Sequence, residues 1–435
     1  MRKIIAVLLF AVTMCLSPAS FAILSMELTQ GVASAVPIAV VPFANSGEAP
    51  QDISTIVAND LQYSGRFKVV GKSALSEFPS SATTVSPDYF RKLGTDNVVV
   101  GKVTPLGGDR YTVNFELLDM YHGKGVDSIL LKKSYTVSSR ELRVAAHHIS
   151  DLIYEALTGV RGVFSTRIAY VVIQPGERGK KRYILEVADQ DGYNPRPMLN
   201  SPEPVMSPSW APDGKNIAYV SFENRRSSVY VQNVSTGARK LVSEFPGING
   251  APAWSPDGKK MAIVLSKSGS PNIYLMDINS HALTQMTNDF YINTEPVWSP
   301  KGQHLLFTSN RSGGPQVYQL DLNSKAVTRV TFDGDYNARP SYTPDGNHIA
   351  MIHKVSGVYK IGLLDLDNGT LRVLTSSAGD SASPSVAPNG SMVLYDTVSR
   401  GRNVLGMVSS DGRIQLVLPA RNGDAQDPAW SPFQS

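Results

Sequence analysis

A short motif recurs at a fixed interval through the second half of the chain. Each copy begins with a proline and carries an aromatic or apolar residue two positions later, and most copies continue into an Asp-Gly or Asn-Gly turn. The leading prolines stand 44 residues apart, at Pro208, Pro252, Pro296, Pro340, Pro384 and Pro428. Short runs of β-branched and aromatic residues fill each interval, which is typical of a four-stranded propeller blade and not of a helical repeat. The period predicts an all-β six-bladed β-propeller over residues 165–435.

The residues of the motif have physical roles in such a blade. Proline suits the first residue of a strand, where no ladder donor is needed, and the glycine accepts the positive φ of a tight turn. The aromatic position offers a large apolar surface for packing one blade on the next. It holds Trp210, Trp254, Trp298, Tyr342 and Trp430, with Val386 in the fifth copy. We interpret these aromatic residues as blade core.

The two ends of the array are complementary. The sixth copy stops at its turn, whereas strand-like runs that lack the motif begin at Thr166. We expect the last strand of the chain to pair with these first strands, because closing the ring leaves no sheet edge open.

Strand-like runs alternate with helical patterns over residues 37–158, which predicts an α/β domain. A helix is expected at residues 52–64, with Asp52 near its cap. A linker over residues 159–164 then joins this domain to the propeller.

The clearest helical pattern covers residues 140–158. Its apolar face is formed by Leu142, Ala145, Ile149, Leu152, Ile153 and Leu157. His147 and His148 lie on the same helix and are interpreted as surface residues.

The first residues resemble an export signal. Arg2 and Lys3 precede an apolar run, and Ser20-Phe21-Ala22 supplies the small residues of a cleavage site. We therefore expect residues 1–22 to be a signal peptide and Ile23 to be the first mature residue of a periplasmic protein. The alternative, a membrane anchor, is disfavoured because the run is shorter than about 20 residues. The single cysteine, Cys15, lies within the leader, so no disulfide is expected.

Motifs that carry chemistry are missing from the sequence. It contains no Gly-x-Ser-x-Gly, no His-Glu-x-x-His and no phosphate-binding glycine loop. His304 and His348 are 44 residues apart, so we interpret them as equivalent turn residues of neighbouring blades.

Without Arg2 and Lys3 the chain has 39 basic and 37 acidic residues, which gives no reason to expect nucleic acid or an anionic membrane as a partner. The sequence predicts a non-enzyme without cofactor or metal. The alternative hypothesis is a propeller lyase or peptidase acting on envelope polymers.

The loops that precede the motifs should share one face, around the mouth of the central channel. Small, neutral and hydrogen-bonding residues dominate there, a composition that suits a wet protein interface. The candidate partner-binding residues at this rim are Met206, Ser207, Asn249, Ala251, Asn293, Thr294, Glu295 and Arg339. The alternative interpretation is that these are ordinary loop tips.

Residues 23–36 stand apart from both domains. Leu24, Met26 and Leu28 alternate with small or polar residues, so this N-terminal arm can form an extended strand. The pattern leaves open whether the arm is free or packs against its own protein.

Taken together, these features resemble the TolB family, the periplasmic component of the Tol–Pal system of Gram-negative bacteria. The likeness rests on the Pro-x-Trp-Ser-Pro-Asp-Gly blades, on residues 37–43 and 157–172, and on the stretches around Asn249 and Asn293.

The resemblance implies two protein partners and a role in envelope maintenance. The lipoprotein Pal would bind at the propeller mouth, with Asn249, Ala251, Thr294 and Glu295 carried over by position, while Ile248 departs from relatives that have histidine there. The protein TolA would bind the arm, through Ile23, Leu24, Met26, Glu27, Leu28 and Gln30. Such a protein is expected to be a monomer, attached to membranes only through its partners, and to support outer-membrane integrity and invagination at cell division.

Overall fold

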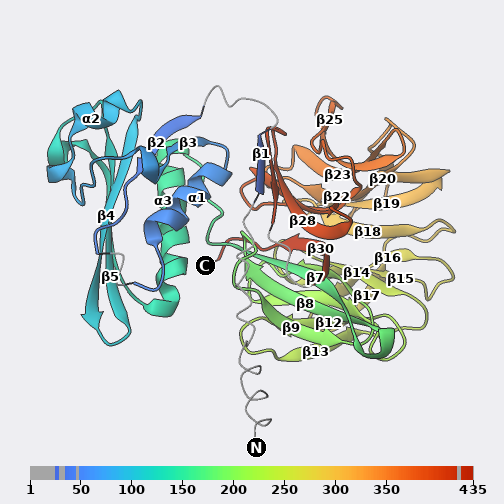
Figure 1. Ribbon diagram of the computed structural model, residues 1–435. Coiled ribbons are helices and arrows are strands. Elements are labelled where there is room, and N and C mark those ends of the chain that lie inside the picture. Colours follow the sequence, from blue (N-terminus) through green and yellow to red (C-terminus); the bar gives the residue numbers. More distant parts are fainter. Residues whose placement is uncertain (1–24, 29–34, 46–48, 419–422, 435) are drawn as a thin grey trace, which may run out of the picture.

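The computed structural model describes residues 25–28, 35–45, 49–418 and 423–434. The expected signal peptide lies outside these residues. Figure 1 shows two domains side by side, an α/β domain and a propeller, with the C-terminus between them. Among the described residues, no helix combines the length and apolar character needed to cross a membrane.

The N-terminal domain is built on one five-stranded sheet. Its strand order is β3-β2-β4-β5-β6, with β2 parallel to β3 and β4 and the remaining pairs antiparallel. The elements are β2 (Val36–Val40), α1 (Ile53–Tyr63), β3 (Phe67–Val70), α2 (Pro87–Lys92), β4 (Asn97–Gly107), β5 (Arg110–Asp119), β6 (Ile129–Ser138) and α3 (Leu142–Thr158). The predicted α/β architecture is confirmed.

The helices of this domain cover the sheet from both sides. α1 and α3 pack on one face, over a core that includes Ile38, Phe115 and Ile149. α2 contributes Phe90 to a second, smaller core on the other face. Asp52 caps α1 as predicted, accepting a hydrogen bond from the Thr55 backbone N–H at 3.2 Å. Because α1 and α3 lie on the side of the sheet that faces the propeller, their outer surfaces form the contact between the domains (Figure 1).

The second domain consists of six blades among the described residues, as the period predicted. Each blade is one antiparallel sheet. Four blades use consecutive strands: β10 (Val205–Trp210), β11 (Asn216–Ser221), β12 (Ser228–Asn233) and β13 (Arg239–Ser243); β14 (Asn249–Trp254), β15 (Lys260–Leu265), β16 (Asn272–Asp277) and β17 (Leu283–Gln285); β18 (Asn293–Trp298), β19 (His304–Ser312), β20 (Gly314–Asp321) and β21 (Val327–Arg329); β22 (Asn337–Tyr342), β23 (His348–Val355), β24 (Val358–Asp365) and β25 (Leu371–Val373).

The last two blades involve the ends of the chain. Their strands are β26 (Ser381–Val386), β27 (Met392–Ser399), β28 (Arg402–Ser409) and β29 (Ile414–Val417), then β30 (Asp424–Trp430), β7 (Arg167–Pro175), β8 (Lys181–Asp189) and β9 (Arg196–Ser201). β30 pairs antiparallel with β7, so the ring closes as expected. The indole N–H of Trp430 also donates to Thr166 Oγ1 at 2.8 Å, which fixes the joint.

Each blade has a bulge in its innermost strand. The residue before the motif proline has a φ between 44° and 54° in all six copies, although none of these residues is glycine. The pairing register shifts at the same place in each blade. A residue in the left-handed conformation costs about 1–2 kcal/mol. The bulge also changes the direction of its side chain, which here points into the central channel.

The N-terminal arm packs against its own protein, which the sequence left open. β1 (Ser25–Leu28) pairs antiparallel with β29, from Ser25 opposite Val417 to Leu28 opposite Ile414. It thereby adds a fifth strand to the outer edge of one blade (Figure 1).

The two domains share a packed interface. α3 ends at Thr158 and β7 begins at Arg167, on either side of the predicted linker. The guanidinium of Arg143, on α3, lies 3.9 Å above the ring of Tyr193 from the propeller. Arg161 stacks on Phe433 at 4.2 Å and accepts a hydrogen bond on its carbonyl oxygen from Asn389 at 2.9 Å. Backbone and side-chain contacts thus join the two domains.

Candidate binding site at the propeller rim and channel

The six bulged residues surround the channel on the propeller axis. The channel has a volume of about 490 Å³. The residues directed into it from the bulges are Ser207, Ala251, Glu295, Arg339, Ser383 and Asp427. Since each occupies the same position of the repeat, the 44-residue period alone places them on one ring.

Arg339 bridges this ring. Its Nε lies 3.1 Å from Glu295 Oε1, and its Nη1 lies 2.8 Å from Asp427 Oδ1. Nη1 also donates to the hydroxyl of Ser383. Burial alone would lower the pKa of the Arg339 guanidinium, but Asp427 and Glu295 reverse that effect and raise it. Burial alone would raise the pKa of Asp427, and Arg339 lowers it below its usual value. Arg339 and Asp427 are therefore both charged at neutral pH.

Asp396 lies beside the same ring but titrates differently. Burial raises its pKa to about 6, the Ser383 hydroxyl opposes this shift, and the charge of Asp427 adds to it. Its Oδ1 is buried, and the described part of the chain offers it no hydrogen-bond partner. The ring thus has beside it a carboxyl group whose charge changes in mildly acidic conditions.

Two of the predicted partner-binding residues are buried beneath the rim. Asn249 and Asn293 are 0% exposed, as is the equivalent Asn337. Asn249 donates to the Phe245 carbonyl at 2.6 Å and accepts from the Phe245 N–H at 2.8 Å. These asparagines fold the preceding loop back on itself, so in this structure their side chains do not reach a partner.

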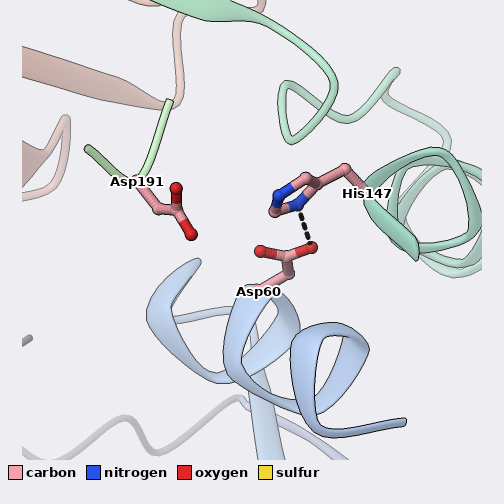
Figure 2. A group of neighbouring side chains, drawn as sticks. All are labelled: Asp60, His147 and Asp191. Carbon is pink, nitrogen blue, oxygen red and sulfur yellow. Dashed lines mark hydrogen bonds and ion pairs between the residues drawn. The ribbon is translucent and has the colours of Figure 1, made fainter. Parts of the chain in front are cut away.

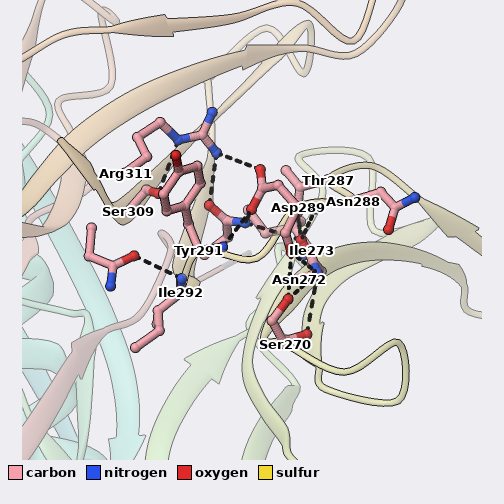
Figure 3. Close-up of polar contacts among 12 residues, drawn as sticks. Ser270, Asn272, Ile273, Thr287, Asn288, Asp289, Tyr291, Ile292, Ser309 and Arg311 are labelled. Atoms are coloured by element: carbon pink, nitrogen blue, oxygen red, sulfur yellow. Dashed lines mark hydrogen bonds and ion pairs between the residues drawn. The ribbon is translucent and has the colours of Figure 1, made fainter. Parts of the chain in front are cut away.

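The loop before β18 shows how firmly a rim loop is held. Arg311 Nη2 donates to Asp289 Oδ2 at 3.1 Å and to Asn293 Oδ1 at 2.9 Å (Figure 3). Asn293 in turn donates to Asp289 Oδ1 at 2.7 Å and to Asn272 Oδ1 at 3.1 Å. Asn310 Oδ1 accepts from the Ile292 N–H at 2.9 Å. This network leaves the loop little freedom, because both of its ends and its central acidic residue are tied to neighbouring blades.

The same loop presents apolar side chains to solvent. Phe290 is 100% exposed and Phe332, on the next rim loop, is 71% exposed. Ile248, Tyr291 and Ile292 are about half exposed on the loops before β14 and β18. These five residues, which we call the apolar rim, lie on loops that enter three successive innermost strands and therefore share one face of the propeller. Large apolar residues that are exposed on one face of a protein are typical of an interaction surface.

The remaining predicted rim residues are half-buried. Met206, Thr294 and Ala251 lie at the start of the innermost strands, and Glu295 and Arg339 have 28% of their side-chain surface exposed within the channel. The sequence prediction named the strand starts and missed the apolar rim. The signal was present, since Phe290-Tyr291-Ile292 and Phe332 interrupt loops that are otherwise polar.

The predicted arm residues are only partly covered by the described chain. Met26, Glu27 and Leu28 belong to β1, while Ile23, Leu24 and Gln30 lie outside the described residues.

The histidines divide into two groups. His304 and His348 are the equivalent first residues of β19 and β23, 3.4 Å from Asp321 and 3.7 Å from Asp365, and their side chains are about one-third exposed. His148 is exposed as predicted, but His147 is buried, with 3% of its side chain exposed. The surface assignment of His147 is therefore wrong, because α3 turns this residue toward α1 and the propeller.

Comparison with known proteins agrees with the fold and the repeat. The TolB amino-terminal domain matches residues 24–126, and the TolB beta propeller domain matches residues 154–434. The crystal structure of TolB from Acinetobacter baumannii superimposes with a TM-score of 0.85 at 39% identity, covering 94% of this chain and 100% of that one.

Curated relatives are similar in sequence over part of their length. Tol-Pal system protein TolB of Coxiella burnetii is 50% identical over 238 residues, 54% of each chain. The protein of the same name from Nitrosococcus oceani is 46% identical over 250 residues, 57% of each chain. The matched region thus spans about half the length of these relatives. With both family domains matched in order and a full-length structural likeness, the chain belongs to the TolB family, whose curated members are Tol–Pal system proteins.

Proposed function

We propose that the protein is a non-catalytic, periplasmic binding component of the Tol–Pal system. Its propeller rim binds the lipoprotein Pal and its N-terminal arm binds TolA, and both contacts support outer-membrane integrity and invagination at division. The observation that carries this proposal is the apolar rim on its rigid loops. A protein partner gains from covering such residues, since each buried apolar side chain contributes about 1.5–3 kcal/mol.

The geometry favours the rim over the channel as the contact. Glu295 and Arg339 already form an ion pair within the ring. A partner could bind either charge only by breaking that ion pair. Phe290 is 100% exposed, and Phe332 is 71% exposed with the Arg329 guanidinium 5.1 Å from the centre of its ring, so most of the surface of both rings is available to a partner. In this proposal the buried asparagines hold the loops and the aromatic residues make the contact.

The rim proposal is tested by calorimetric titration of the chain from Ile23 with the soluble domain of Pal from the same organism. We expect saturable one-to-one binding that the double variant Phe290→Ser, Phe332→Ser weakens at least tenfold. The matched control is Phe78→Ser, which removes a phenylalanine that is 56% exposed on the other domain. Unchanged affinity in the double variant, or no binding at tens of micromolar by the unmodified protein, would overturn the proposal.

The arm proposal rests on backbone pairing. β1 is held to β29 as an added edge strand, and extended segments that add to sheet edges are a common form of peptide recognition. A chain that begins after residue 33 should lose binding of the TolA domain and keep binding of Pal. Equal TolA binding with and without the arm would contradict this assignment.

The alternative of a propeller enzyme remains open to a direct test. Turnover of peptidoglycan fragments that follows the purified protein, and that Asp396→Asn abolishes, would replace the binding proposal with a catalytic one.

A further inference from the structure

A buried histidine lies where the two domains touch. His147 comes from α3, and only 3% of its side chain is exposed. Asp60 comes from α1 of the same domain, whereas Asp191 lies in the turn between β8 and β9 of the propeller. One ring nitrogen of His147 and one carboxylate oxygen of each aspartate lie within 4.8 Å of one another. Figure 2 shows the imidazole between the two carboxylates. No part of the proposed binding function uses this cluster.

The two nitrogens of the imidazole face different domains. Nδ1 of His147 lies 2.8 Å from Asp60 Oδ2, which also accepts a hydrogen bond from Ser150 Oγ at 2.7 Å, so the ring is held within its own domain. Nε2 is buried and has no hydrogen-bond partner among the described residues. The Nε2 edge of the ring is turned toward Asp191 (Figure 2). Because an imidazolium carries a proton on both nitrogens, the charged ring directs its second N–H toward a carboxylate of the other domain.

The groups that face His147 carry more negative than positive charge. Asp60 on α1, Asp189 at the end of β8 and Asp191 bring three carboxyl groups to the interface. Arg143, one helical turn before His147 on α3, is ion-paired with the two carboxyl groups of the propeller. The imidazolium of His147 is therefore a second cation at this place, and it brings the cluster closer to neutrality.

Two further titratable groups lie on the same two helices. Burial raises the pKa of Asp151 on α3, whose carboxylate accepts hydrogen bonds from two backbone N–H groups shortly before β7. Burial and the charge of Asp191 raise the pKa of Tyr63 on α1, so this phenol stays neutral. Neither group supplies a positive charge. Among all these groups, the cations that face the carboxylates are thus Arg143 and protonated His147.

The charge state of His147 depends on its neighbours. Burial alone would lower the pKa of the imidazole, but Asp60 and Asp191 more than offset burial and raise it above the ordinary value of 6.5, against an opposing effect of Arg143. The folded protein therefore binds this proton more tightly than the unfolded chain does. The stabilisation that results is complete below about pH 6.5 and is lost as the pH rises through the higher pKa of the folded protein.

The surroundings of the cluster are of low polarity. A cavity of about 30 Å³ beside it is lined by Asp60 and Asp191 and otherwise mainly by apolar side chains, such as Met392 and Leu416 of the propeller. Charges attract one another more strongly in such surroundings than at an exposed surface. Gain or loss of one proton here should therefore affect the contact between the domains more than the same change on the surface would.

We propose that His147 is a pH-sensitive tie between the N-terminal domain and the propeller. In its protonated form, the imidazole attracts Asp60 of its own domain and Asp191 of the other domain at the same time. Loss of the proton removes the attraction to Asp191 and leaves three carboxylates near one another with Arg143 as their counter-charge. The domains are thus held together in mildly acidic to neutral conditions and separate more readily in alkaline conditions. This tie goes beyond the proposed binding function, because it acts between the domains and not at the rim or the arm.

The first test is an NMR titration of the histidine ring protons in the chain from Ile23. We expect His147 to titrate above pH 6.5, and we expect Asp191→Asn to weaken its proton binding at least threefold, because Asp191 attracts the imidazolium across the interface. The matched control is Asp367→Asn, which removes an exposed turn carboxylate elsewhere on the propeller and should leave the titration unchanged. Unchanged proton binding in Asp191→Asn, or titration of His147 at or below pH 6.5 in the unmodified protein, would overturn the proposal.

The second test measures the separation of the domains. The chain from Ile23 contains no cysteine, so nitroxide labels can be attached at Lys133→Cys on β6 and Lys259→Cys in the turn before β15, both at exposed positions. Double electron–electron resonance should give a narrow distribution of label distances at pH 6 and a broader one at pH 9. In His147→Gln the two distributions should be the same. The matched control is His122→Gln, which removes an exposed histidine and should keep the pH dependence.

Two outcomes of the distance measurement would contradict the proposal. One is equal distributions at pH 6 and pH 9 in the labelled protein with His147 intact. The other is a pH dependence that persists in His147→Gln. If circular dichroism shows that His147→Gln does not fold, Asp191→Asn provides the same comparison, because Asp191 lies in a turn and its replacement leaves the helices unchanged.

Discussion

The channel and the domain interface each contain an arginine held between two carboxylates. In the channel, Arg339 bridges Glu295 and Asp427, and all three residues come from the same position of the repeat. At the interface, Arg143 bridges Asp189 and Asp191, and no sequence period relates these residues. The chemistry is shared, but the first cluster is built by repetition and the second by the packing of two different domains.

This difference has a mechanical consequence. The channel cluster joins three blades of one closed ring, so damage there should weaken the propeller as a whole. The interface cluster joins two units that each have their own core, so damage there should separate the domains before it unfolds either one.

The largest expected effect comes from removing the bridge in the channel. Arg339→Met leaves Glu295 and Asp427 facing one another without a counter-charge, and we expect a loss of about 3 kcal/mol in the free energy of unfolding. Urea denaturation measures this loss. Arg196→Met removes an exposed arginine on β9 and should change stability by less than about 0.5 kcal/mol. Equal losses of unfolding free energy in the two variants would show that the ion pairs of Arg339 add no more stability than an exposed arginine does.

The second prediction concerns the buried carboxyl beside that ring. Because burial raises the pKa of Asp396 to about 6, the folded protein binds this proton more tightly than the unfolded chain does. Stability from this group is complete below the unfolded pKa, near pH 4, and about 3 kcal/mol should be lost as pH rises through about 6. Asp396→Asn should flatten that part of the pH profile, measured by urea denaturation at several pH values. The control Glu203→Gln changes an exposed carboxylate and should leave the pH dependence of stability unchanged. If Asp396→Asn kept the same pH dependence as the unmodified protein, the loss of stability would not come from Asp396.

The third prediction breaks the interface bridge. Arg143→Met leaves the carboxylates of Asp189 and Asp191 together and removes the stacking on Tyr193, at a cost of about 1–2 kcal/mol. We expect calorimetry to show the single transition split into two, with faster proteolysis at the linker. One shifted but unsplit transition, like that expected for Arg339→Met, would contradict the distinction between the two clusters.

The smallest expected effect isolates packing from charge. Gly65 ends α1 with φ +70°, and a Cβ there would lie 2.4 Å from Ile414 Cγ1 of the propeller. Gly94 has nearly the same backbone angle, φ +71°, and no atom of the described residues lies within 4 Å of its Cβ position. Alanine at either site should cost about 1 kcal/mol for the backbone, and Gly65→Ala roughly another 1 kcal/mol for the clash. Thermal unfolding of the pair measures the difference, and equal losses would mean that Ile414 moves aside freely.

The sequence was most informative where the chain repeats. A constant spacing of the motif prolines determines the number of blades, the closure of the ring and the common position of Glu295, Arg339 and Asp427. In a repeat protein, the position of a residue within the repeat predicts its place in the three-dimensional ring, because equivalent residues of the blades occupy equivalent places. The caps and the apolar face of the long helix were likewise local, and α1 and α3 formed as predicted.

Only the tertiary structure decided which polar residues are buried. Asn249 and Asn293, which the sequence predicts as contact residues, are buried and hold the rim loops, while His147, predicted to be exposed, lies between the two domains. The pairing of the arm with β29 also joins segments almost 400 residues apart. Burial of these groups depends on surfaces contributed by distant parts of the chain, and neither helical nor strand periodicity contains that information. The sequence by itself determined the ring and its spacing, and the packing of the second domain and the arm against that ring determined the rest.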